Sequence, residues 1–210
     1  MRDGGASRER LLDAATAEFA AYGIAGARVD RISAAASVNK AQMYGWFGSK
    51  DGLFDAVFAR HLRGIVDAVP FDADDLPGYA TALYDSYLTD PELVRLASWY
   101  RLERVPTGEL LAAHPGHGDD KHDAIARAQA SGRIVDDVRP DEVYALVIAL
   151  AGTWSPISAT FTASDDDGEQ EHERRRSALR SVVSRALVPA PSVTRRRRPA
   201  PPPGRPAAPA

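Results

Sequence analysis

The sequence of 210 residues predicts an all-α protein of about nine helices, and three features support this prediction. Apolar residues recur at helical spacing between residues 7 and 188, as in Leu11, Ala15, Phe19 and Tyr22. No stretch of alternating β-branched residues, which would favour a half-buried strand, interrupts this range. Segments rich in acid and proline, such as FDADDLPG, TDPE and RPDE, separate the helical stretches and mark the loops.

Four helices are expected in the N-terminal part of the chain. The first begins at Ser7, a suitable N-cap, and ends at Gly23, a suitable C-terminal stop. Two short helices follow over residues 29–36 and 40–47, and only three residues separate them. Ser49 is expected to cap a longer helix, because the apolar positions after it again recur at helical spacing.

Five further helices are expected beyond Pro70. Pro91 and Pro140 suit the first turn of a helix. Proline lacks a backbone N–H, and in the first turn an N–H would find no acceptor within the helix. Gly132 suits a helix stop. The expected helices span residues 77–89, 91–104, 119–131, 140–162 and 170–188.

The formal net charge of −3 conceals three unlike segments. Residues 1–64 carry nine basic against seven acidic side chains, whereas residues 65–188 carry twelve against twenty-two. Residues 189–210 carry five arginines, no acid and many prolines, a composition that cannot bury enough apolar surface to become ordered. We therefore expect one domain over 1–64, a larger one over 65–188 and a disordered Pro/Arg-rich tail over 189–210.

Composition and motifs exclude several classes of protein. The absence of cysteine excludes disulfide scaffolds, thiol nucleophiles and thiolate metal sites. No apolar run approaches the roughly 18 residues of a membrane span, so we expect a soluble, cytoplasmic protein with no membrane partner. No nucleophile elbow, phosphate-binding loop or dinucleotide fingerprint is present, so we expect neither an enzyme nor a cofactor.

One cluster resembles a set of metal ligands. His114, His117 and His122 lie near Asp119 and Asp120 in the segment HPGHGDDKH. This segment is rich in proline and glycine and lacks the i, i+4 pair of ligands that a helix would present. A solvated loop is therefore favoured and no metal is expected. A metal-dependent protein built on the three histidines is the less favoured alternative.

The two short helices and their three-residue turn have the spacing of a helix-turn-helix, with the longer helix as support. The segment over residues 27–54 reads ARVDRISAAASVNKAQMYGWFGSKDGLF. It resembles the DNA-binding domain of the tetracycline-repressor (TetR) family of bacterial transcriptional regulators. The matching positions are Val29, Ile32, Ala34, Ala35, Val38, Lys40, Tyr44, Phe47, Ser49, Lys50 and Leu53.

The second short helix has the side chains that a recognition helix requires. Gln42 can form a bidentate pair with adenine, and Lys40 can reach guanine or a phosphate. Tyr44 and Trp46 offer a hydroxyl and an indole N–H on the exposed side of the same helix. Lys50 lies in the first turn of the next helix, where free amides favour a phosphate. The expected DNA-binding residues are Arg28, Lys40, Ala41, Gln42, Tyr44, Trp46 and Lys50. The alternative is that the polar side chains only solvate this surface while the two rings pack.

Three positions depart from the family pattern. Ala27 and Arg28 stand where the family commonly has Thr or Ser, so the usual N-cap of the first short helix is missing, at a cost of about 0.5–2 kcal/mol. Ser37 replaces the turn glycine and is less suited to a positive φ. Gly45 lies inside the recognition helix, where it costs roughly 1 kcal/mol relative to alanine.

The resemblance implies that residues 65–188 bind a small effector and form a homodimer. The last two helices of the family usually pack against those of a partner, which here means the helices near 140–162 and 170–188. The last helix has one apolar face, formed by Leu179, Val182, Val183, Ala186 and Leu187. Such a face needs cover, which either the protein's own core or a partner supplies.

Aromatic side chains in the middle helices are candidates for an effector pocket. They are Tyr84, Tyr87, Trp99, Tyr100, Trp154 and Phe161. Their polar tips can orient a ligand in an apolar cavity, whereas an ordinary packed core would use the same residues. The identity of the effector stays open.

Together these features predict a ligand-responsive transcriptional repressor. We expect it to bind a palindromic double-stranded DNA operator as a homodimer and to leave the operator when a small-molecule effector binds. A helical ligand- or protein-binding module that does not read DNA is the alternative from another class. The sequence does not separate repressor from activator, or name the operator and the regulated genes.

Overall fold

The computed structural model describes residues 3–108, 110 and 119–190. Among these residues it contains nine α-helices, one short 3-10 helix and no strand, which confirms the predicted all-α class. In chain order the elements are α1 (Asp3–Gly26), α2 (Val29–Ala36), α3 (Lys40–Phe47), α4 (Lys50–Ala68), α5 (Leu76–Thr89), α6 (Pro91–Glu103), α7 (Asp119–Ala130), α8 (Pro140–Ala151), η1 (Gly152–Trp154) and α9 (Glu169–Leu187).

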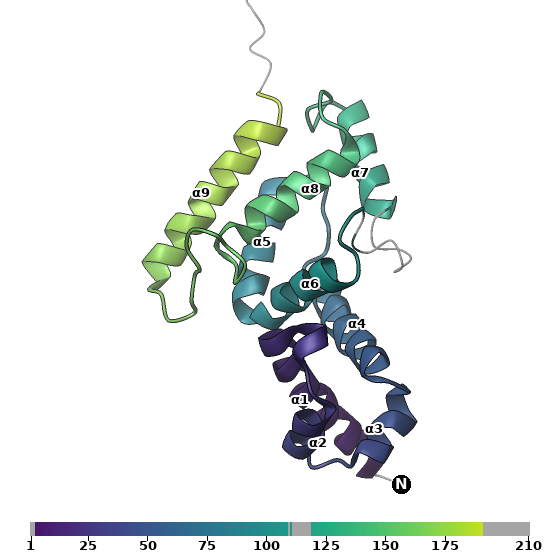
Figure 1. Ribbon diagram of the computed structural model, residues 1–210. Helices are drawn as coiled ribbons and strands as arrows, with labels where there is room; N and C mark the ends of the chain where they lie inside the picture. The colour runs from purple at the N-terminus through teal and green to yellow at the C-terminus, as the bar shows by residue number, and fades with distance from the viewer. Residues whose placement is uncertain (1–2, 109, 111–118, 191–210) are drawn as a thin grey trace, which may run out of the picture.

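The helices form two parts with α6 between them (Figure 1). Helices α1–α4, which include the N-terminal end of the chain, are here called the head, and α5 and α7–α9 are called the body. Helix α6 packs against α1 and α4 of the head and also against α5 of the body. The position of α6 therefore determines how the two parts meet.

A cluster of aromatic rings fixes α6 to the head. Phe19 of α1 and Phe54 of α4 are fully buried, and their ring centroids lie 5.2 Å apart in an edge-on arrangement. Tyr100 of α6 joins them, with its ring centroid 6.0 Å from that of Phe54 and 5.0 Å from that of Phe58. Because burial of one such side chain is worth about 1.5–3 kcal/mol, the head core is incomplete without α6.

The body core lies between α5, α7, α8 and α9. The hydroxyl oxygen of the buried Tyr84 of α5 lies 2.7 Å from Nδ1 of His172 of α9, which joins these two helices. This core covers part of the apolar face predicted for the last helix, while Val182 is 49% exposed and Ala186 is also exposed. The covered residues of that face are Leu179, Val183 and Leu187.

The helix expected over residues 140–162 is shorter than predicted. Helix α8 ends at Ala151, and the chain continues through η1 into an irregular segment that reaches α9. Pro156 explains this end, because proline disfavours helical backbone in the residue before it, and Ser155 is extended with ψ of 170°.

The first helix starts earlier than predicted, because α1 begins at Asp3. Ser7 lies inside α1, and its hydroxyl accepts a hydrogen bond from the Arg10 guanidinium at 2.9 Å. At the other end Gly23 interrupts the helical backbone with φ of 73° and ψ of −179°, which agrees with the expected stop. Ser49 caps α4 as predicted, since its hydroxyl accepts from the Gly52 amide at 2.9 Å.

Some predictions fall outside the described residues. His114 and His117 lie there, as does most of the 189–210 tail, while the described His122 packs on Tyr144 with ring centroids 5.8 Å apart. In the described ranges no cluster of three or more His, Cys, Asp or Glu side chains is arranged to hold a metal ion. No helix in these ranges is long and apolar enough to cross a membrane.

We expect Ser37→Gly to raise the free energy of unfolding by about 0.5–1 kcal/mol. Ser37 ends α2 in the left-handed region with φ of 53° and ψ of 43°, where a Cβ is unfavourable. Urea unfolding followed by circular dichroism measures the change. Ser37→Ala is the control, because it keeps the Cβ and should bring no gain. An equal gain in both variants would contradict the role assigned to the backbone.

Candidate nucleic-acid interface

Helix α3 is held from one side and presents polar side chains on the other. Met43 is fully buried in the head core and anchors the helix. The Asn39 side chain caps it by accepting a hydrogen bond from the Gln42 amide at 2.8 Å. Tyr44 is 48% exposed, and its hydroxyl has no hydrogen-bond partner in the described part of the chain. The other exposed members of the predicted set on α3 are Lys40, Ala41 and Gln42.

Two predicted DNA-binding residues are placed differently from the sequence expectation. Trp46 was expected on the exposed side of α3, but it is half-buried and packs against the head core. The Lys50 ammonium group donates hydrogen bonds to the carbonyl oxygens of Ala25 and Ala27, at 3.1 Å each. It therefore pairs with carbonyl oxygens at the end of α1 and just after it, where a cation is favourable.

The ammonium group of Lys40 at the start of α3 forms an ion pair with Asp30 of α2. The hydrogen bond to Asp30 and its negative charge raise the pKa of Lys40 above the usual value. Both side chains are exposed, so the pair is open to water and to any approaching phosphate. Such exposed pairs contribute little stability, which leaves the cation available for another anion.

Glu18 of α1 supplies the cap that α2 lacks in its own sequence. Its buried carboxylate accepts hydrogen bonds from the Arg28 backbone N–H and from Nε of Arg31, at 2.8 Å each. Burial on its own raises the pKa of Glu18, but the hydrogen bonds from Arg31 and Arg28 outweigh burial and lower it. The sequence signal for this residue was an acid on the apolar face of the first helix, next to Phe19.

Two basic residues of α1 lie beside the helix-turn-helix and were missed by the sequence prediction. The exposed Arg8 places its guanidinium 4.8 Å from the ring centroid of Phe47 of α3. Nε of Arg10 donates a hydrogen bond to the Ala36 carbonyl at the end of α2, at 3.3 Å. The exposed Arg28 lies at the start of α2, as expected. Arg8 and Arg10 therefore extend the basic surface around α3 beyond the predicted set.

The head joins the rest of the protein where the kinked end of α1 contacts α6. The kink at Gly23 frees the backbone amides that follow it, and the Glu103 carboxylate accepts hydrogen bonds from Ile24 and Ala25, at 2.9 and 2.7 Å. The indole N–H of Trp99 donates to the Ala20 carbonyl oxygen at 3.2 Å. These three contacts, here called the α1–α6 joint, fasten the first helix of the head to α6.

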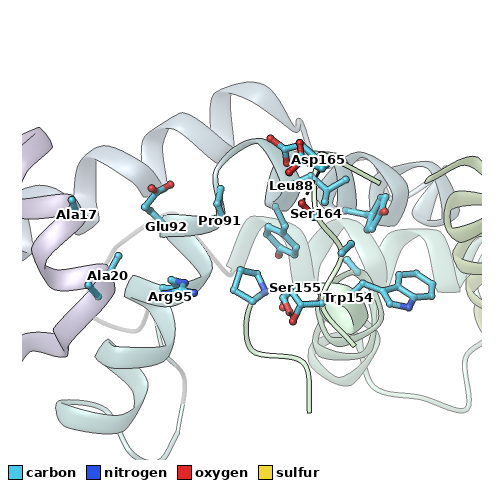
Figure 2. Close-up of a pocket in the computed structure, with 18 residues that line it drawn as sticks. Ala17, Ala20, Leu88, Pro91, Glu92, Arg95, Trp154, Ser155, Ser164 and Asp165 are labelled. Carbon is cyan, nitrogen blue, oxygen red and sulfur yellow. Dashed lines mark hydrogen bonds between the residues drawn. The ribbon is translucent and has the colours of Figure 1, made fainter. Parts of the chain in front are cut away.

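A cavity of about 540 Å³ lies between the head and the body. Figure 2 shows Ala17 and Ala20 of α1 and Arg95 of α6 on one side, across from Ser155 and Asp165. Three of the six aromatic residues predicted for an effector pocket line it, namely Tyr84, Tyr87 and Trp154.

The other three predicted pocket residues lie elsewhere. Trp99 belongs to the α1–α6 joint and Tyr100 to the head core, because the face of α6 that bears them turns toward α1 and α4. Phe161 is 53% exposed, and the Arg175 guanidinium lies 5.2 Å from its ring centroid. Helical spacing alone did not show which side of α6 faces the cavity.

A helix-turn-helix with an exposed polar α3, joined through α6 to a helical body that borders a cavity, defines a class of protein. It is a DNA-binding transcriptional regulator of the helix-turn-helix type.

Comparison with protein families gives the particular family. Residues 11–57 match the family described as bacterial regulatory proteins, tetR family, and residues 75–185 match the tetracyclin repressor-like C-terminal domain. The chain therefore belongs to the TetR family, which confirms the resemblance drawn from residues 27–54. Proteins of this family are transcriptional regulators and not enzymes, as expected.

Individual relatives agree with this assignment. The chain is 37% identical over 158 residues to the HTH-type transcriptional repressor SCO4008 of Streptomyces coelicolor, a match that covers 74% of this chain and 81% of that protein. The crystal structure of SCO4942 from the same organism is also 37% identical, with a TM-score of 0.72, and the match covers 86% and 98% of the two chains. A gamma-butyrolactone receptor structure, at 17% identity and a TM-score of 0.64 over 90% and 91%, shares the fold.

We expect Gly23→Ala to lower the free energy of unfolding by about 2 kcal/mol or more. A Cβ at this position would lie 2.5 Å from Oε1 of Glu103 and 2.9 Å from the Trp99 ring, in addition to the strain of a positive φ. Gly48→Ala is the matched control, because its φ is 74° but a Cβ there meets nothing within 4 Å. Chemical denaturation compares the two. Equal losses would show that the joint itself contributes nothing.

Proposed function

We propose that this protein is a ligand-responsive repressor that acts in the cytoplasm, binds a palindromic operator as a homodimer and leaves it when an effector binds. The observation that carries the proposal is the exposed polar surface of α3, which is fixed by Met43 and by the Asn39 cap. A rigid helix with unpaired donors on its outer side is what the major groove of DNA requires.

The individual side chains have distinct roles in this proposal. Gln42 and Tyr44 are the readers of base edges, because their polar groups have no partner in the described part of the protein. Lys40, Arg28 and Arg8 are exposed and supply phosphate contacts. Lys50 acts indirectly in this scheme, since its ammonium group holds the end of α1 beside α2.

Support for a homodimer comes from α8 and α9. These helices pack against each other and still expose Leu146 at 47% and Val182 at 49%. Regulators with the family's fold read DNA as pairs, because two recognition helices about 34–36 Å apart contact the same face of the duplex. We therefore assign the exposed apolar faces of α8 and α9 to a second copy of this chain, in agreement with the sequence expectation for the last two helices.

The α1–α6 joint supports the release step of the proposal. A ligand that moves α6 would also move the end of α1, since Glu103 and Trp99 hold it through three hydrogen bonds. Coupling of this kind requires the effector to prefer the arrangement that does not fit DNA, typically by about 1–3 kcal/mol.

We expect Gln42→Ala to weaken binding to the preferred duplex by about tenfold or more, and Tyr44→Phe by a few-fold, because each removes a donor from the outer side of α3. Fluorescence anisotropy at fixed salt measures both, with a duplex selected by the wild-type protein from random-sequence DNA. Gln170→Ala, an exposed position on α9, is the control.

Two outcomes would refute the DNA-binding assignment. One is unchanged affinity in both α3 variants. The other is the failure of the wild-type protein to select any duplex, which would favour a helical binding module without DNA readout.

We expect Leu146→Glu and Val182→Glu to convert a dimer into a monomer, because each places a charge in the proposed interface. Sedimentation velocity measures the mass in solution. Leu102→Glu is the control, since Leu102 is 69% exposed on α6 and lies outside the two helices. A monomeric wild-type protein, or variants that remain dimeric, would disprove this interface.

A further inference from the structure

The cavity of about 540 Å³ has walls from both parts of the molecule. Its size lies in the range of about 300–1,000 Å³ that is usual for small-molecule sites. Ala17, Ala20 and Ala21 of α1 form the head side, and their small side chains leave the space open. The remaining wall comes from α5, the first turns of α6 and the segment that follows α8.

Acidic side chains outnumber basic ones around this cavity. Three carboxylates line it, those of Glu92, Asp165 and Asp166, against the single guanidinium of Arg95. Within the described residues none of these four side chains forms an ion pair, so the negative charge is not neutralised by the protein. Figure 2 shows Glu92 and Asp165 among the side chains that line this space. An unneutralised negative cavity favours a cationic ligand.

Aromatic and apolar side chains give the cavity a second property. Tyr87 and Trp154 line it and are half-buried, and Leu88, Pro91 and Ala163 add apolar surface. Aromatic faces attract organic cations through their quadrupole, by about 0.5–2 kcal/mol for each favourable contact. An inorganic cation gains nothing from such walls, so they favour a cation with an apolar body.

A buried hydroxyl in the wall points independently to a ligand. Ser155 is 4% exposed and lines the cavity, and its Oγ has no hydrogen-bond partner among the described residues. A buried polar atom without a partner is costly, and most such atoms in proteins are satisfied by another group. A polar group of a bound molecule would supply the missing partner.

We infer that this cavity binds an amphipathic organic cation, and that this cation is the effector. Glu92 and Asp165 hold its charge, Tyr87 and Trp154 contact its apolar body, and Ser155 Oγ bonds a polar group where the ligand has one. This inference rests on the proposed function, because it names the effector class of the repressor.

The location of the site gives the ligand a direct effect on the head. A molecule in the cavity touches Ala17 and Ala20 of α1 on one side and α5 and α6 on the other. Ala20 also accepts the Trp99 hydrogen bond of the α1–α6 joint. The affinity for the ligand therefore depends on how the head sits against the body. Because coupling between two sites is reciprocal, the factor by which DNA changes the affinity for the ligand is also the factor by which the ligand changes the affinity for DNA.

Two ions of similar size and shape and opposite charge test the inference. Isothermal titration calorimetry of the full-length protein compares tetraphenylphosphonium with tetraphenylborate. We expect the phosphonium to bind at least about tenfold more tightly, and Glu92→Gln with Asp165→Asn to weaken its binding by about tenfold, because two attractive charges are lost. Ala17→Trp, which fills the space from an exposed position on α1, should abolish binding.

The control variant combines Asp136→Asn with Asp137→Asn. It removes the same number of charges from the exposed loop before α8, outside the cavity, and should leave the phosphonium affinity unchanged. Equal or tighter binding of the borate, or equal losses in the two double variants, would overturn the inference. DNA binding without ligand is measured in parallel. If it is intact while the phosphonium preference is absent, only this inference fails, and the proposed function stands.

Ser155→Ala tests the buried hydroxyl without any ligand. Because the hydroxyl has no partner in the described part of the chain, its removal should raise the melting temperature of the unliganded protein or leave it unchanged. A lower melting temperature would show that the hydroxyl already has a structural partner and is not reserved for a ligand.

Discussion

Helix α6 contributes to two packing arrangements at once, and the rest of the structure depends on this constraint. Its Tyr100 ring completes the aromatic core of the head, so α6 cannot leave without opening that core. Its N-terminal turns, with Glu92 and Arg95, form a wall of the cavity beside the body. A displacement of α6 would therefore disturb both arrangements together, because packed interiors change arrangement in discrete steps.

Several charged side chains near the DNA-binding surface bond to backbone groups at helix ends, and so they are not free to contact DNA. Glu18 caps the start of α2, Lys50 neutralises the end of α1, and Glu103 receives the amides that the Gly23 kink frees. Each charge meets backbone groups that a helix end leaves unsatisfied. Under the proposed function, DNA affinity must therefore come from a few placed donors and from the two heads of a dimer, since residues 1–64 have only two basic side chains more than acidic ones.

The net charge of −3 acquires a structural meaning from the two parts. In the cavity between the head and the body, Glu92, Asp165 and Asp166 outnumber Arg95, whereas the head carries Arg8, Arg28 and Lys40 around α3. In the proposal, DNA, which is an anionic polymer, thus meets a basic surface, and the organic cation meets an acidic one. A basic head and an acidic body also favour approach to DNA in one orientation.

The sequence by itself determined the family and the order of the helices, though not the start of α1 or the end of α8, because helical spacing, caps and the 27–54 segment are local properties of the chain. It also predicted that Lys40, Gln42 and Tyr44 of α3 contact DNA, and the structure leaves all three exposed while the buried Met43 anchors the helix. Only the tertiary structure decided the partners of Glu18 and Lys50 and the two faces of α6. Those contacts join residues 10 to 79 positions apart in the chain, and no local pattern specifies which distant group an exposed or buried charge will meet.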